Sequence, residues 1–141
     1  MNERDLYGVW KLVSLRSVMT GGSEPKDIYG VDPVGKIIFT TDNLMMTVIT
    51  AKDRARSQSD AGDAALFRSM MAYSGPFRVE GGDQFITTVE VAWNPDWVGT
   101  EQVRTFSIEG DILSIITAET ADPIEPEKTG HGVVTWQKTP P

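Results

Sequence analysis

Hydrophobic and polar residues alternate in short runs along most of this chain, and turn-forming residues separate the runs. Alternation with a period of two is typical of strands that bury one face, and closely spaced turns favour antiparallel pairing. Eight such strands are the number that closes a small up-and-down barrel. We therefore predict an all-β, eight-stranded antiparallel barrel. The expected strands are 8–18, 34–40, 44–50, 77–80, 84–92, 100–108, 112–118 and 132–138. The first is expected to end at a turn at Gly21-Gly22, a tight turn at 41–43 joins 34–40 and 44–50 into a hairpin, and a loop over 119–130 precedes the last strand.

One segment follows the period of a helix instead of a strand. Within 63–74, Leu66 and Tyr73 lie seven positions apart with apolar residues between them, and Asp63 is a suitable N-cap. We predict one short helix over 63–74, lying across one barrel opening and ending at Gly75-Pro76.

The alternation also predicts which side chains point into the barrel. In the strand 100–108, Arg104 shares a face with Phe106, so the guanidinium should point inward among apolar side chains. The first strand is ambiguous, because the set that contains Trp10 and Arg16 is no more apolar than the opposite set.

Composition narrows the classes of function. The 141 residues are 40% hydrophobic and 23% charged, which is ordinary for one globular domain over 1–141. The net charge of −7 would repel a nucleic-acid backbone, and no apolar run is long enough to cross a membrane, so neither partner is expected. Cysteine is absent and there is one histidine, which argues against a zinc site and fits a reducing cytoplasm. We expect no metal and no cofactor.

Several motifs extend this picture along most of the chain. They are GVWKLVS at 8–14, DPVG at 32–35 leading into IIFT at 37–40, NPDWVGTEQVR at 94–104, the Gly110-Asp111 turn and VTW at 134–136. With these motifs the chain resembles the bacterial and fungal lipocalin-like domain family. The resemblance implies a barrel with a central cavity and, by analogy, the binding of a small hydrophobic or amphipathic molecule.

We predict that seven side chains line or gate this cavity. They are Arg16, Phe39, Met45, Tyr73, Phe77, Trp97 and Arg104. Burial of apolar surface would supply most of the affinity, and Arg104 would orient the ligand by binding a carboxylate or a carbonyl. A structural role for Arg104 competes with this one and is favoured, because lipocalins often stack an arginine on the opening tryptophan, here Trp10.

Two other functions stay open. A cofactor-free isomerase or cyclase would use Arg104 and Tyr73 to stabilise negative charge, and a buried, perturbed tyrosine or carboxylate beside Arg104 would favour it. Glu90 would be the natural base, but strand alternation places it outside the barrel, and His131 is expected to be exposed. The other possibility is an oligomerising module with a fully packed barrel. Assembly into a homodimer is also left open.

Overall fold

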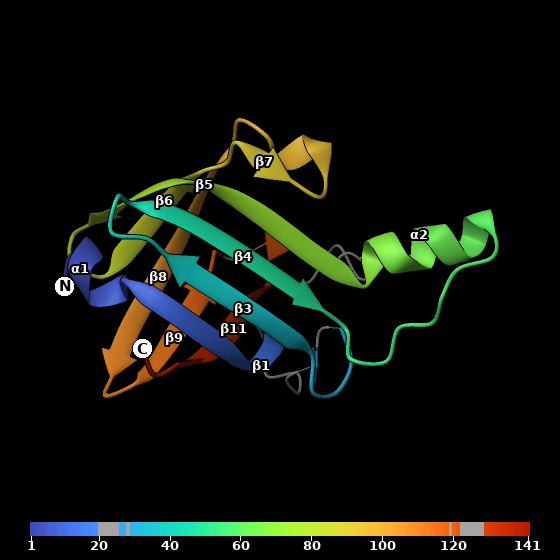
Figure 1. Cartoon of the computed structure of the whole chain (residues 1–141), viewed down its shortest axis with the longest axis horizontal. Coiled ribbons are helices and arrows are strands. Elements are labelled where there is room, and N and C mark those ends of the chain that lie inside the picture. Colours follow the sequence, from blue (N-terminus) through green and yellow to red (C-terminus); the bar gives the residue numbers. More distant parts are fainter. Residues whose placement is uncertain (20–25, 28, 119, 122–128) are drawn as a thin grey trace.

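Eight antiparallel strands close into a barrel, as predicted (Figure 1). The computed structural model describes residues 1–19, 26–27, 29–118, 120–121 and 129–141. In barrel order the strands are β1 (Gly8–Met19), β3 (Val34–Phe39), β4 (Leu44–Thr50), β5 (Met70–Glu80), β6 (Gln84–Thr88), β8 (Glu101–Glu109), β9 (Ile112–Thr117) and β11 (Thr129–Lys138). Each strand pairs with the next, and β11 pairs back with β1, so the sheet closes on itself.

Short strands and helices lie outside the eight barrel strands. The strands β2 (Lys26–Asp27), β7 (Val91–Ala92) and β10 (Thr120–Ala121) pair with β1, β5 and β11, respectively. The helices are α1 (Glu3–Leu6), α2 (Asp60–Arg68) and the 3-10 helix η1 (Pro95–Trp97). The expected turn at Gly21-Gly22 lies outside the described residues, as does most of the expected loop 119–130.

A β-bulge resolves the ambiguity of the first strand. The register of β1 against β11 shifts between Leu12 and Ser14, and the side chain of Val13 is 50% exposed. The extra residue turns the strand over, so Trp10 faces the interior before the bulge and Leu15 faces it afterwards. Neither of the two expected faces is therefore inward along the whole strand.

The predicted short helix is present, but its bounds differ. It covers 60–68 instead of 63–74, because the Ser59 hydroxyl caps its N-terminus by accepting from the Gly62 N–H at 3.0 Å. Arg54 holds its C-terminus by donating to the Leu66 carbonyl at 2.9 Å. The helix buries no residue, and Figure 1 shows it projecting from the end of the barrel where β4 ends and β5 begins.

The residues expected to finish that helix belong to β5 instead. Between Met70 and Pro76 this strand pairs with β4, and the pairing outweighs the helical spacing of the apolar residues. The expected strand 84–92 is interrupted after Thr88, and the chain then returns to β5 as β7. A Cβ on Gly75 would lie 1.8 Å from the Thr88 carbonyl oxygen, so this close approach requires glycine.

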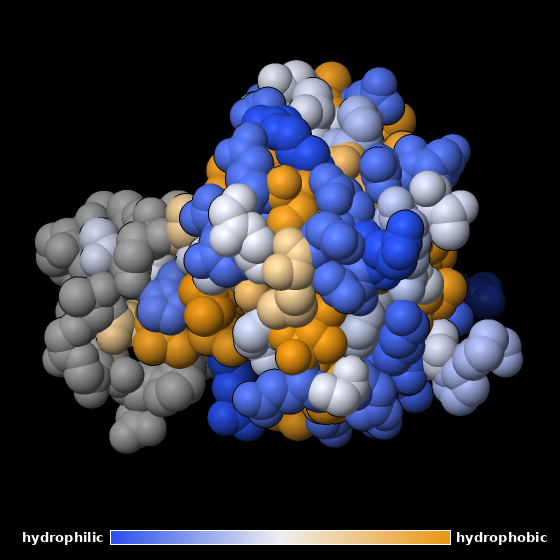
Figure 2. All heavy atoms as spheres, turned by 90° about the vertical axis from the view of Figure 1, so that its left-hand side faces the viewer, coloured by the Kyte–Doolittle hydropathy of each residue, from blue (hydrophilic) through white to orange (hydrophobic). Residues whose placement is uncertain are grey.

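One end of the barrel, here called the plugged end, is filled by the N-terminal segment. In α1 the Asn2 side chain accepts from the Arg4 N–H, and Asp5 accepts from the Asn2 N–H, which forms a capping box. Leu6 at the end of α1 is fully buried, and its carbonyl accepts from the Trp10 Nε1–H at 2.8 Å. Figure 2 faces this end and shows it covered by closely packed side chains.

Candidate ligand-binding site

The opposite end of the barrel, here called the pocket end, contains a pocket of about 320 Å³. The residues around it come from all eight barrel strands, from the connection after β6 and, in the case of Tyr29, from the segment before β3, and most are apolar or aromatic. They include Leu15, Ser17, Met19, Tyr29, Ile37, Thr47, Ile49, Met71, Tyr73, Phe85, Trp93, Trp97, Arg104, Ile115, Thr117, Val134 and Trp136. Arg104 is the only Asp, Glu, Lys or Arg side chain among the described lining residues.

The floor of the pocket consists of core side chains, and part of its wall has no side chain. Phe85 and Trp136 are 1% and 2% exposed, and both line the pocket while belonging to the barrel core. On β11 the strand alternation places Gly130 and Gly132 on the same face as Val134 and Trp136. Neither glycine contributes side-chain atoms to the wall, and an added Cβ on Gly130 would lie 2.7 Å from the Val18 carbonyl oxygen, so β11 and β1 approach closely there.

Arg104 lies on the inner face of β8, as the alternation predicted. Its Nη2 donates to Gln102 Oε1 at 3.2 Å, and its Nη1 donates to the Val103 carbonyl at 2.9 Å. Gln102 Nε2 in turn donates to Thr100 Oγ1 at 2.8 Å, and the Thr100 hydroxyl donates to the Trp97 carbonyl at 2.6 Å. This chain of hydrogen bonds connects the guanidinium to the loop that carries the tryptophans.

Tyr73 lies beside Arg104, on the inner face of β5. It is 5% exposed, and burial raises the pKa of its hydroxyl above the ordinary value of 10, while the nearby Arg104 charge and hydrogen bonding to Arg104 oppose part of that rise. The hydroxyl therefore stays protonated near neutral pH and can donate a hydrogen bond. Two donors, a cation and a phenol, thus lie side by side at the pocket.

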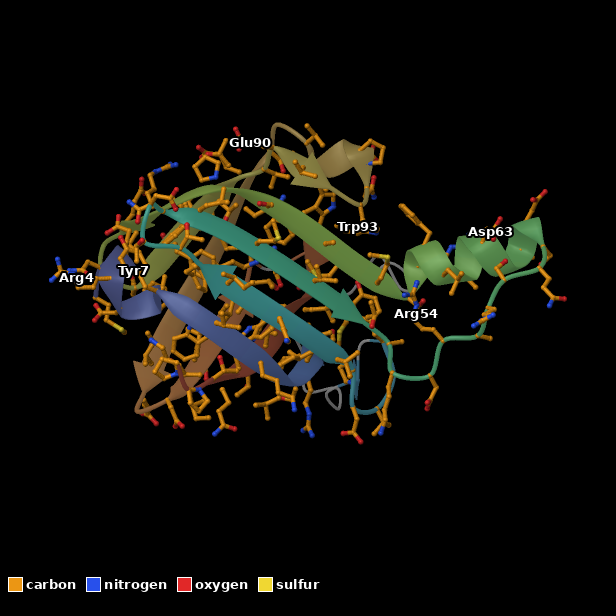
Figure 3. The ribbon with its side chains drawn as sticks, viewed as in Figure 1. Arg4, Tyr7, Arg54, Asp63, Glu90 and Trp93 are labelled. Atoms are coloured by element: carbon orange, nitrogen blue, oxygen red, sulfur yellow. The ribbon has the colours of Figure 1, made fainter. Side chains whose placement is uncertain are left out.

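Four aromatic rings form a continuous run at this end. Tyr73 and Trp97 have ring centroids 5.2 Å apart, Trp97 and Trp93 lie 5.0 Å apart, and Trp93 and Phe67 lie 6.3 Å apart. Figure 3 shows Trp93 below β7 and beside α2. The run connects α2 to the pocket interior, and these separations are typical of attractive aromatic contacts.

The structure separates the seven predicted site residues into three groups. Tyr73, Trp97 and Arg104 line the pocket. Phe39, Met45 and Phe77 are buried in the core and do not line it. Arg16 is exposed on the outer side of β1, because it follows the bulge.

The favoured structural pairing of Arg104 with Trp10 is wrong. The cation above the Trp10 ring is the Lys138 Nζ, 5.1 Å from the ring centroid, and its ammonium also donates to the Tyr7 carbonyl at 2.8 Å. The closing strand β11 brings Lys138 opposite Trp10 in register. The cation that stacks on Trp10 is therefore Lys138 and not Arg104.

Sequence reasoning missed several lining residues for identifiable reasons. Ser17 and Met19 line the pocket only because the bulge reverses the face of β1. Trp136 belongs to the VTW motif but was not predicted to lie at the pocket, which it lines, and its buried Nε1–H has no hydrogen-bond partner among the described residues. The alternating glycines of Gly130-His131-Gly132 were a sequence signal that part of the barrel wall has no side chains.

Acid–base groups are sparse around the pocket. Glu90 is exposed and points away from the barrel in Figure 3, in agreement with its expected outward position. His131 is among the residues that line the pocket and is half-buried, where an exposed position was expected. Within the described ranges, no three His, Asp or Glu residues gather in a way that could hold a metal ion. None of the helices described is long and apolar enough to span a bilayer.

The comparisons with known proteins agree with this architecture. The model of the lipocalin-like domain family matches residues 7–139, and the chain belongs to that family. The chain is also similar to a protein of Aspergillus oryzae named "4'-hydroxy-3'-methoxypropiophenone carrier protein ppsC". The two are 33% identical over 91 residues, which is 60% of this chain and 80% of the relative.

Proposed function

We propose that this protein binds a small hydrophobic or amphipathic molecule, without covalent chemistry, in the pocket at one end of the barrel. The observation that carries the proposal is an apolar pocket of about 320 Å³ with a single arginine among its described lining residues. Pockets for small molecules commonly begin near 300 Å³ and combine an apolar wall with a few polar groups that fix orientation.

The expected energetics match such a role. Each ~100 Å² of apolar ligand surface removed from water contributes about 2.5 kcal/mol, so the wall would supply most of the affinity. Tyr73, Trp97 and Arg104 are the predicted site residues placed to touch a ligand. Phe39, Met45 and Phe77 would act behind the pocket, by holding the barrel in shape.

The relative from Aspergillus oryzae supports the proposal from another direction. Its name calls it a carrier protein for a substituted propiophenone, which is an aromatic ketone. A molecule of that kind is both apolar and equipped with oxygen acceptors, as the pocket described here would require. We propose a carrier or binding role of the same general type for this chain.

Filling the pocket tests the proposal directly. Ser17→Phe places a ring in the pocket, and Ser107→Phe places the same ring on the exposed side of β8 as a matched control. The probe is N-phenyl-1-naphthylamine, which is neutral, aromatic and fluorescent in apolar surroundings. We expect saturable binding to the unmodified protein and to Ser107→Phe, and at least about a tenfold loss of affinity in Ser17→Phe, equivalent to 1.4 kcal/mol.

The proposal fails if the probe does not bind saturably or if Ser17→Phe binds it as well as the control does. Native mass spectrometry of protein purified from its source provides an independent readout. It should detect a small molecule that co-purifies with the unmodified protein and is absent from Ser17→Phe.

A specific observation also favours the second candidate, a cofactor-free isomerase or cyclase. Tyr73 is buried, its pKa is raised, and it lies beside Arg104, so both could donate to a carbonyl oxygen that gains negative charge. The described lining residues include no carboxylate that could act as the base. Deuterium exchange at the carbon next to the carbonyl of propiophenone tests this candidate. Exchange that depends on the protein and is lost in Tyr73→Phe would support catalysis.

Residence in the cytoplasm and homodimer formation stay predictions. The absence of cysteine supports a reducing compartment. Exposed Val34, Met46 and Val48 on the outer side of β3 and β4 support self-association. Size-exclusion chromatography of Val48→Lys beside the unmodified protein tests the homodimer.

A further inference from the structure

We propose that the pocket selects flat aromatic molecules that carry an anionic oxygen group, and that Arg104 binds this group while the aromatic run holds the ring. The proposal rests on the binding function proposed above and adds the chemical class of the ligand. Three observations support it. They concern the hydrogen bonds of Arg104, the other donors around the pocket and the order of the aromatic rings.

The charge of Arg104 has no anionic partner within the part of the chain that the structure describes. Its hydrogen bonds go to the neutral oxygens of Gln102 and Val103, and it also hydrogen-bonds with the neutral Tyr73 hydroxyl. A guanidinium has five N–H donors, so further donors remain for a ligand. Because a half-buried charge is stabilised strongly by an opposite charge, a carboxylate or sulfonate oxygen is a better partner for this site than a neutral group.

Three other polar groups around the pocket can also donate hydrogen bonds. The Tyr73 hydroxyl beside Arg104 is protonated, and the buried Trp136 Nε1–H has no partner among the described residues. The Thr117 hydroxyl oxygen already accepts from the Gly132 N–H at 2.7 Å. Together with Arg104, these donors favour a ligand whose polar end accepts hydrogen bonds.

The rings indicate the shape of the remaining part of the ligand. Trp97 contacts Tyr73 on the interior side and Trp93 on the outer side, and both tryptophans are only half-buried. The hydrogen-bond chain from the Trp97 carbonyl through Thr100 and Gln102 fixes these rings relative to Arg104. A flat aromatic ring that lies against the tryptophans would therefore place a substituent near the guanidinium.

A matched pair of fluorescent probes tests this ligand class. N-phenyl-1-naphthylamine and 8-anilinonaphthalene-1-sulfonate share the same two aromatic groups and differ by one sulfonate. We expect the unmodified protein to bind the sulfonate probe about tenfold more tightly than the neutral probe, since a charge-assisted hydrogen-bonded pair commonly contributes that much.

Variants at two arginines assign this preference to one side chain. Arg104→Met should lose about tenfold in affinity for the sulfonate probe and keep the neutral probe within about twofold. Arg104→Lys, which retains the charge, should keep part of the preference. Arg78→Met is the matched control, because Arg78 is exposed and pairs with Glu80 and Glu101 on the outer surface. It should bind both probes as the unmodified protein does.

Each outcome separates the two proposals. Equal affinity for the two probes, or tighter binding of the neutral probe, would overturn the ligand class but leave the binding function intact. Absence of saturable binding for both probes would overturn the binding function itself. An Arg104→Met variant that loses both probes equally and melts at a lower temperature would assign Arg104 a structural role and overturn its part in selection.

Discussion

The two ends of this barrel contain similar aromatic and apolar residues, yet one end is solid and the other contains a pocket. At the plugged end, Phe39 lies 5.0 Å from Phe77, ring centroid to ring centroid, and both rings are buried. At the pocket end, Trp93 and Trp97 are also 5.0 Å apart, but both are half-buried. Aromatic content alone therefore does not determine whether a barrel end is filled.

The difference comes from what enters the barrel at each end. The plugged end receives Leu6 and Trp10 from the N-terminal segment, joined by the 2.8 Å hydrogen bond. The pocket end has Gly130 and Gly132 on an inner face, and its helix α2 buries no residue. We infer that the plugged end stabilises the fold, and that the pocket end can change its side chains with a smaller effect on stability.

Removing a tryptophan at each end should have the largest effect on this comparison. Trp10→Ala should lower the free energy of unfolding by about 3–5 kcal/mol, because it leaves a cavity in a closed core. Trp93→Ala should lower it by about 1 kcal/mol or less, because the ring is half-exposed. Urea unfolding followed by circular dichroism measures both values. A Trp93→Ala loss as large as that of Trp10→Ala would remove the distinction between the ends.

A pair of methionines should give the next largest effect. Met45 is fully buried in the core and Met71 lines the pocket. Met45→Ala should lower the free energy of unfolding by about 2–5 kcal/mol and leave the affinity for N-phenyl-1-naphthylamine unchanged. Met71→Ala should cost about 1 kcal/mol or less and change that affinity. The reverse pattern would mean that the pocket is not where the probe binds.

Removing the N-cap of each helix should have a smaller effect on the free energy of unfolding, and this effect should again differ between the two ends. Asn2→Ala should lower the free energy of unfolding by about 1 kcal/mol, because α1 carries Leu6 into the core. Ser59→Ala removes the cap of α2 and should leave global unfolding unchanged, since α2 can fray without opening the barrel. Tryptophan fluorescence during urea unfolding reports both. An equal loss in Ser59→Ala would make α2 part of the cooperative core.

The smallest expected effect concerns pH at the pocket end. Burial raises the pKa of Tyr73 and of Tyr29 above 10 in the folded protein, so each binds its proton more tightly when folded. Their contribution to stability is therefore fully present below pH 10 and falls as the pH rises through the folded-state pKa values. Tyr73→Phe and Tyr29→Phe should each reduce this alkaline loss. Urea unfolding at pH 9, 10 and 11 measures it, and unchanged slopes in both variants would contradict the assignment.

Much of the architecture followed from local patterns in the sequence. Alternation and turn residues predicted the eight barrel strands. The alternation of side chains along β8 correctly predicted that Arg104 faces the interior. The β3–β4 hairpin was predicted at its turn, where the Asn43 N–H donates to the Thr40 carbonyl at 3.0 Å. These features depend on neighbours in the sequence, so the sequence by itself contains the information.

Other features depended on contacts between distant segments. The bulge in β1 arises from its register with β11 and removed Arg16 from the interior. Pairing with β4 converted the end of the predicted helix into β5 and placed Tyr73 beside Arg104. Register with β11 also brought Lys138, and not Arg104, to Trp10. Only the closed sheet could decide these points, because a one-residue shift in pairing reverses the face of every residue that follows.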